Sequence, residues 1–158
     1  MKPDNPQTYG TVSRCLHWLM ALCFVVMFGT ALAWNINEDY FSLMGIHKNC
    51  GIALLVLALV RFVWMHVNLR RRPQHNIIVK LGHIALYLLM IAVPAVGLIR
   101  NIGKGAPDGS GEVEWMVQLG NQWHGELAIA LGILILGHIA MAVVHQIKRE
   151  KIINRMLG

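Results

Sequence analysis

Four long apolar runs, separated by short polar segments, constrain this 158-residue chain more than any other feature. The run from His124 to His145 contains twenty-two residues. At a helical rise of about 1.5 Å per residue it would span roughly 33 Å, close to the thickness of the hydrocarbon core of a bilayer. We therefore predict an all-α fold, an integral membrane four-helix bundle forming a single domain over residues 1–158, with helices over residues 14–34, 47–67, 77–99 and 123–147.

The composition indicates a membrane protein rather than a soluble one. Hydrophobic residues make up 56% of the chain and charged residues 14%, and the mean hydropathy is +0.51. An average soluble domain is less apolar and more highly charged. The first run ends in Ala31, Leu32 and Ala33, which resembles a signal-peptide cleavage site, but the run is longer than the usual core of such a signal. We interpret it as the first transmembrane helix.

The basic residues between the apolar runs predict the orientation of the bundle. One side of the membrane would carry the larger group, which comprises Lys2, Arg14, Arg70, Arg71, Arg72, Lys80, Lys148, Arg149, Lys151 and Arg155. The other side would carry Lys48, Arg100 and Lys104. An even number of spans with this bias places both termini in the cytoplasm. The net charge of +6 therefore reflects topology and not nucleic-acid binding, and the Arg70–Arg72 run is expected to contact lipid headgroups.

The eight histidines can be assigned to depths in this topology. His47 and His124 begin the second and fourth helices, so both are expected near the outer surface. The cytoplasmic half holds more candidates than a single site needs, namely His17, His66, His83, His138 and His145, with His75 in a loop. Fourteen residues separate His124 from His138 and seven separate His138 from His145, so these three imidazoles share one helix face.

Imidazoles that face one another at two depths suggest two metals stacked across the membrane, since coordination satisfies one nitrogen of each ring. Haem iron leaves two opposed axial positions for imidazoles, and a four-helix bundle can enclose this flat, apolar cofactor. No Cys-x-x-Cys-His motif occurs, which excludes covalent c-type attachment. The alternative hypothesis is a histidine-lined carrier for a divalent metal, but it requires intramembrane carboxylates, for which Glu126 is the candidate.

Four motifs in the chain are distinctive. They are TVSRCLHWL at residues 11–19, IHKNCGI at residues 46–52 followed by Arg61, LGHIALY at residues 81–87, and the pair Trp123-His124 with His138 fourteen residues later. Together they resemble the bacterial cytochrome b561 family over nearly the whole chain. The resemblance implies a four-helix di-haem b protein of the bacterial inner membrane that exchanges electrons with quinone.

The resemblance also implies the axial ligands. His17 and His138 would bind the haem on the cytoplasmic side, and His47 and His124 the outer haem. Depth alone would favour His145 as the partner of His17. The family spacing favours His138. The two irons must also lie close enough for electrons to pass between them, and the distance along the fourth helix from His124 is about 21 Å to His138 but roughly 31 Å to His145.

Three further residues are secondary candidates for cofactor binding. Arg61 is a charge within a transmembrane span, and it would pair either with a haem propionate or with a lipid headgroup. His83 matches a family position that is not an axial ligand. It would either form a hydrogen bond near a haem or quinone, or lie at the membrane interface. His145 would form a hydrogen bond with a propionate or a headgroup.

The predicted function is transmembrane electron transfer through two b haems, as an oxidoreductase or electron carrier without a bond-making side chain. The family suggests a membrane quinone as one partner. The donor would be a periplasmic protein or a small reductant such as superoxide, which Lys48, Arg100 and Lys104 could attract. The segment 100–122, where we expect Trp115 in a loop, is more compact than in longer relatives, so a donor or quinone function there stays open.

Overall fold

Four long helices dominate the computed structural model, which describes residues 2–69, 77–105, 110–148 and 153–157. They are α1 (Thr11–Ile36), α2 (Met44–Val67), α3 (Ile77–Gly103) and α4 (Glu114–Ile147), joined by the short 3-10 helix η1 (Glu38–Leu43) and followed by α5 (Asn154–Leu157). Each long helix is apolar enough and long enough to cross a membrane. The predicted all-α membrane fold with four transmembrane helices is therefore confirmed.

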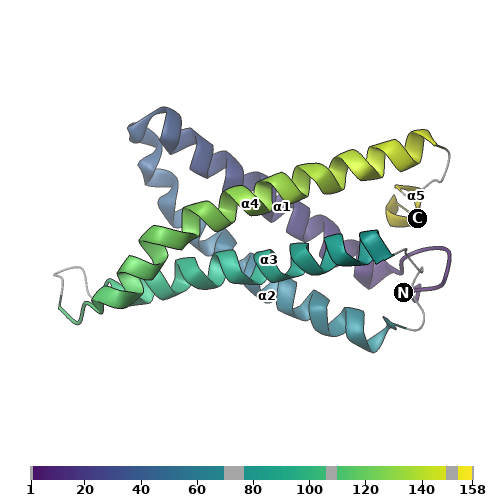
Figure 1. Cartoon of the computed structure of the whole chain (residues 1–158), viewed down its shortest axis with the longest axis horizontal. Coiled ribbons are helices and arrows are strands. Elements are labelled where there is room, and N and C mark those ends of the chain that lie inside the picture. The colour runs from purple at the N-terminus through teal and green to yellow at the C-terminus, as the bar shows by residue number, and fades with distance from the viewer. Residues whose placement is uncertain (1, 70–76, 106–109, 149–152, 158) are drawn as a thin grey trace.

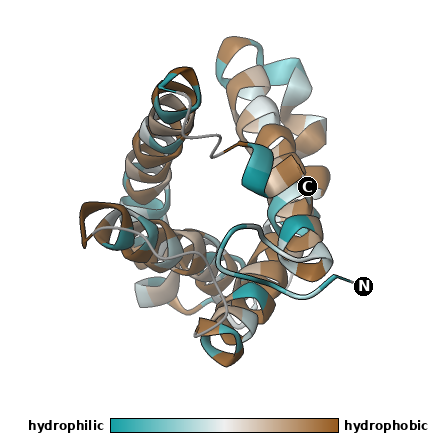
Figure 2. Ribbon diagram, turned by 90° about the vertical axis from the view of Figure 1, so that its right-hand side faces the viewer, coloured by the Kyte–Doolittle hydropathy of each residue, from teal (hydrophilic) through white to brown (hydrophobic). Residues whose placement is uncertain are grey.

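The long helices pack in chain order. α1 lies against α2, α2 against α3, and α3 most extensively against α4 (Figure 1). Large apolar side chains cover the outside of the bundle, among them Val25, Ile36 and Leu136, and Figure 2 shows hydrophobic residues on all sides of the helices. Such a surface is suited to lipid, because it would expose too much apolar area to water.

The fourth helix begins earlier than predicted. α4 starts at Glu114, nine residues before the expected position 123, so placing Trp115 in a loop was wrong. Residues 114–122 contain no proline, and the Gln118 side-chain amide donates to the Glu114 carboxylate one turn away at 2.8 Å. The Glu114 carboxylate also lies in the first turn, where it interacts favourably with the helix dipole. These features extend the helix past its apolar run.

Both ends of the chain lie at the same end of the bundle (Figure 1). The Tyr9 amide donates to the Arg155 carbonyl at 3.2 Å, the Arg14 guanidinium to the Leu157 carbonyl at 2.7 Å, and the Trp18 indole to the Met156 carbonyl at 3.3 Å. We call this end the terminal end, and we call the opposite end, which carries η1 and the α3–α4 connection, the loop end. That the terminal end faces the cytoplasm stays a prediction from the charges.

A small apolar core fills the middle of the bundle. It contains Met20, Met27, Leu54, Ala58, Tyr87, Met90, Val93 and Leu131. Along α1 these residues follow His17, along α2 they follow His47, and on α4 Leu131 lies midway between His124 and His138. The core therefore separates two levels of histidines, one near each end of the bundle.

Candidate functional site

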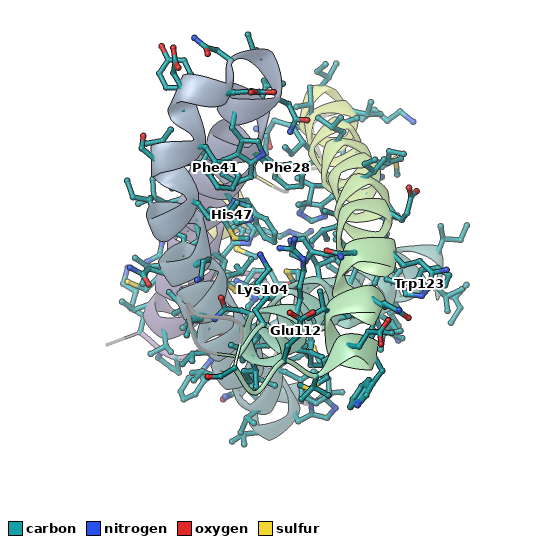
Figure 3. All side chains as sticks on the ribbon, turned by 90° about the vertical axis from the view of Figure 1, so that its left-hand side faces the viewer. Phe28, Phe41, His47, Lys104, Glu112 and Trp123 are labelled. Atoms are coloured by element: carbon teal, nitrogen blue, oxygen red, sulfur yellow. The ribbon has the colours of Figure 1, made fainter. Side chains whose placement is uncertain are left out.

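The first pair of histidines lies near the loop end, and we call it the loop-end pair. The ring centres of His47 on α2 and His124 on α4 are 6.3 Å apart, and the ring planes form an angle of 80°. Figure 3, viewed from the loop end, shows His47 pointing into the space between the helices. The structure thus brings together the two histidines that the sequence placed at matching depth.

Backbone carbonyls orient both rings of the loop-end pair. The Nδ1–H group of His47 donates to the Met27 carbonyl at 3.2 Å and contacts the Thr30 hydroxyl oxygen at 3.1 Å. The Nδ1–H group of His124 donates to the Val93 carbonyl at 3.0 Å. A histidine whose Nδ1 proton is held by a carbonyl presents Nε2 as a lone-pair donor, which is the usual arrangement of a metal ligand.

The sequence reasoning missed a glycine that makes room for this pair. A Cβ atom on Gly97 would lie 2.8 Å from Cε1 and 2.9 Å from Nδ1 of His124, so only a residue without a side chain lets the ring lie against α3. The signal was present in the sequence, since Gly97 follows Pro94 within an apolar helix. The role of Gly97 could not be recognised from the sequence, because it depends on which face of α4 packs against α3 at this position.

Aromatic residues surround His47 on the side of the loop end. The Trp34 and His47 rings are in edge contact with centres 5.0 Å apart, and the Trp34 and Phe41 centres are 6.2 Å apart. Phe41 is 60% exposed, and Figure 3 shows Trp123 pointing away from the bundle, where it is 45% exposed. Trp34 therefore shields one side of the imidazole and Phe41 packs against Trp34, whereas Trp123 faces the surroundings of the protein.

The second pair lies near the terminal end, and we call it the terminal-end pair. The ring centres of His17 on α1 and His138 on α4 are 6.3 Å apart, with an interplanar angle of 63°. His83 of α3 lies beside them, with its ring centre 5.4 Å from that of His138. His145 lies two turns further along α4, so His138 is the ring of that helix that faces His17.

Arg61 completes the terminal-end cluster from α2. Its Nε donates to the Tyr87 hydroxyl of α3 at 3.0 Å, and its Nη1 donates to the Ser13 carbonyl of α1 at 3.4 Å. Ser13 lies one turn before His17 on α1, and Tyr87 lies one turn after His83 on α3, so these bonds hold the guanidinium at the level of the terminal-end pair. Of the two roles that the sequence left open for Arg61, this inward position favours a cofactor over a lipid headgroup.

The distance between the two rings within each pair provides a test of whether haem fits. Two imidazoles that bind one metal from opposite sides, each through a bond of about 2.0 Å, have ring centres roughly 6 Å apart. Both pairs match this value at 6.3 Å. Neither pair has the third and fourth ligands that zinc prefers, since the described residues contain no group of three or more His, Cys, Asp or Glu suited to a metal ion. The donor set fits haem iron better than a divalent-metal carrier.

The remaining histidines lie elsewhere. His66 is exposed at the end of α2, where its Nδ1 donates to the Phe62 carbonyl at 2.9 Å and its ring contacts the Phe62 ring with centres 4.3 Å apart. His75 and the expected headgroup cluster of Arg70–Arg72 lie outside the described residues. Glu126 is exposed on α4, two residues after His124.

The basic residues of the loop end are not equivalent. Arg100 is half-buried between α3 and α4, where its Nε donates to the Asn121 side chain at 2.6 Å and its aliphatic part packs against Gly120. Lys48 and Lys104 are exposed, and Figure 3 shows Lys104 at the same end of the bundle as His47. The two lysines are therefore free to attract an anionic donor, whereas Arg100 mainly joins two helices.

Taken together, the fold and the two facing histidine pairs define a four-helix membrane protein with paired imidazoles at two levels. Comparison with known proteins agrees. The family described as prokaryotic cytochrome b561 matches residues 8–158, so the chain belongs to this family. Its members are cytochromes b, and the chain is accordingly a multi-pass protein of the bacterial inner membrane that uses b-type haem in transmembrane electron transfer.

Two curated relatives show the range of the similarity. Cytochrome b561 homolog 2 of Escherichia coli (strain K12) is 26% identical over 181 aligned positions, which cover 98% of this chain and 94% of the relative. Probable superoxide oxidase CybB of Yersinia pestis is 31% identical over 101 positions, covering 57% of this chain and 56% of that protein. No solved structure matches the chain significantly.

Proposed function

We propose that this chain carries electrons across the membrane through two b haems, one bound by His47 and His124 and the other by His17 and His138. The observation that carries the proposal is the equal spacing of 6.3 Å between the rings of each pair. Each haem would supply an iron that accepts and releases one electron. One histidine of each pair, His124 and His138, lies on the same long helix α4, so the two pairs lie at two levels, as a path through a membrane requires.

Groups of the protein itself prepare the loop-end pair and the middle of the bundle for this role. The carbonyls of Met27 and Val93 hold the loop-end rings in the tautomer that leaves Nε2 available. Between the two levels, Leu54 and Leu131 are almost completely buried and exclude water from the middle of the bundle. In an interior without water, fewer water molecules must reorient when an electron moves. The electrostatic interaction between the site and nearby charges is also stronger there.

The proposed partners follow from the family and from the loop-end charges. Family membership supports a membrane quinone as one redox partner. A relative named as a probable superoxide oxidase supports superoxide as the donor, with a periplasmic protein as the alternative. The exposed side chains of Lys48 and Lys104 would attract either an anion or an acidic protein surface toward the loop-end pair.

Haem stoichiometry tests the proposal directly. The protein purified in detergent should contain two noncovalent b haems per chain, with the visible spectrum of six-coordinate, low-spin iron. His47→Ala and His124→Ala should each lose the loop-end haem and keep the other. His66→Ala is the matched control, since this exposed ring contacts Phe62 in a tilted arrangement outside both pairs, and it should keep both haems. One haem in the unaltered chain, or haem loss in His66→Ala, would refute the assignment.

Quinone coupling needs a separate measurement. The reduced protein should be reoxidised by a short-chain quinone with dioxygen excluded, and the rate should saturate with quinone concentration. Slow reoxidation at saturating quinone would remove quinone from the proposal and leave the haem assignment intact.

A further inference from the structure

Arg61 is a half-buried charged side chain of α2 at the terminal-end cluster. Both of its hydrogen-bond acceptors, the Tyr87 hydroxyl and the Ser13 carbonyl, are neutral groups. An arginine cannot lose its proton in a protein, so the guanidinium keeps its full positive charge there. A charge within a transmembrane span is costly, and such residues usually serve a function.

The acceptors of Arg61 are themselves held in place. Ser13 is fully buried, its hydroxyl donates to the Asp4 carboxylate at 2.9 Å, and the same oxygen accepts the Trp64 indole N–H at 3.0 Å. Tyr87 is also buried, in edge contact with Phe62 at 5.9 Å between ring centres. The guanidinium position is therefore set by α1 and α3 together, and it does not depend on a ligand to hold it.

The loop end offers a contrast. Its half-buried arginine, Arg100, donates to Asn121, which lies about one turn before His124 on α4, and Lys48 and Lys104 are exposed to the surroundings. Exposed charges are screened by water and salt. Arg61, by comparison, forms both of its hydrogen bonds in part-buried surroundings, to the Ser13 carbonyl one turn before His17 and to the Tyr87 hydroxyl one turn after His83, whereas the bond from Arg100 to Asn121 is exposed. The field of a fixed positive charge is therefore stronger at the terminal-end pair.

We propose that Arg61, held by Tyr87 and Ser13, raises the redox potential of the terminal-end haem above that of the loop-end haem. Reduction adds one electron, so a nearby positive charge stabilises the reduced form, and a low dielectric enlarges the effect. When one electron crosses, the loop-end site is oxidised by one electron and the terminal-end site is reduced by one. The charge therefore directs electrons from the loop end toward the terminal end. This inference rests on the proposed function, in which each pair binds one haem.

Redox titration followed by visible spectroscopy tests the inference on the purified holoprotein. The unaltered protein should titrate in two steps, and His124→Ala, which keeps the terminal-end haem alone, should retain the step at higher potential. Arg61→Gln should lower the midpoint potential of that step and so narrow the difference between the two midpoint potentials. Arg61→Lys keeps the charge and should keep most of that difference. Arg100→Gln is the matched control, because it removes the same charge at the other end, and it should leave the higher step unchanged.

The outcomes separate this inference from the proposed function. A higher-potential step that is unchanged in Arg61→Gln, or that moves equally in Arg100→Gln, overturns the role of Arg61. If Arg61→Gln loses the terminal-end haem, Tyr87→Phe decides, because it keeps the charge but releases one of its anchors. In Tyr87→Phe the midpoint potential of the higher step should fall, by less than the loss of the whole charge would cause. An unchanged midpoint potential overturns the inference. A single haem in the unaltered chain would refute the proposed function instead.

Discussion

The two histidine pairs have the same ring spacing but are surrounded by different kinds of groups. At the loop end, backbone carbonyls of α1 and α3 orient His47 and His124, and a glycine makes room for one ring. At the terminal end, side chains from all four long helices gather around His17 and His138, including the guanidinium of Arg61 and the imidazole of His83. Helix backbones thus determine geometry at one level, and side-chain charge determines the electrostatics at the other.

The largest expected effect concerns which histidine of α4 serves the terminal-end pair. His138→Ala should lose one of the two proposed haems, because its ring is the one that faces His17 at 6.3 Å between ring centres. His145→Ala should keep both, since that residue lies two turns away along the helix. Haem content per chain, measured on both variants at matched folding, checks the assignment. The reverse pattern would move the ligand to His145.

Gly97→Ala tests whether backbone geometry governs the loop end. The added Cβ would lie 2.8 Å from the His124 ring, and overpacking of this kind costs about 1–3 kcal/mol. Loop-end haem content and thermal stability should both fall, and the terminal-end haem should remain. Gly125→Ala is the matched control on α4, where a Cβ meets nothing within 4 Å. Equal losses in both variants would show that the Gly97 contact is unimportant.

Ser13→Ala probes the side-chain network of the terminal end. It removes the acceptor of the Trp64 indole and the donor to the Asp4 carboxylate, and the loss of buried hydrogen bonds costs about 1–3 kcal/mol. The free energy of unfolding in detergent should fall by this order, and the terminal-end haem should be released first on heating. Ser42→Ala, at an exposed position in η1, should have little effect. A stability unchanged by Ser13→Ala would argue against a structural role for the network.

The smallest expected effect concerns the donor. Changing Lys48 and Lys104 together to Ala should slow reduction by an anionic donor a few-fold at low salt, because both side chains are exposed and can steer an anion. The difference should disappear as salt rises and screens these charges. Arg100→Ala should change the rate less, since its Nε is engaged by Asn121. A rate that does not depend on salt would show that the lysines do not steer the donor.

The sequence predicted the helices better than their ends. Apolar runs of membrane length are visible without any partner, so the four transmembrane helices were predictable. The start of α4 at Glu114 was not, because hydropathy marks where a helix contacts lipid and not where its hydrogen bonds begin. The same limit explains why Trp115 was assigned to a loop.

The sequence by itself determined the class of fold, the family motifs and the matching depth of His47 and His124, because helical periodicity and membrane thickness are local properties. Only the tertiary structure decided that Gly97 opens a place for the His124 ring, and that the Arg61 guanidinium bonds to Tyr87 and Ser13 inside the bundle. These contacts join residues far apart in the chain. They depend on how each helix is rotated about its axis, which the packing of neighbouring helices sets and no single helix encodes.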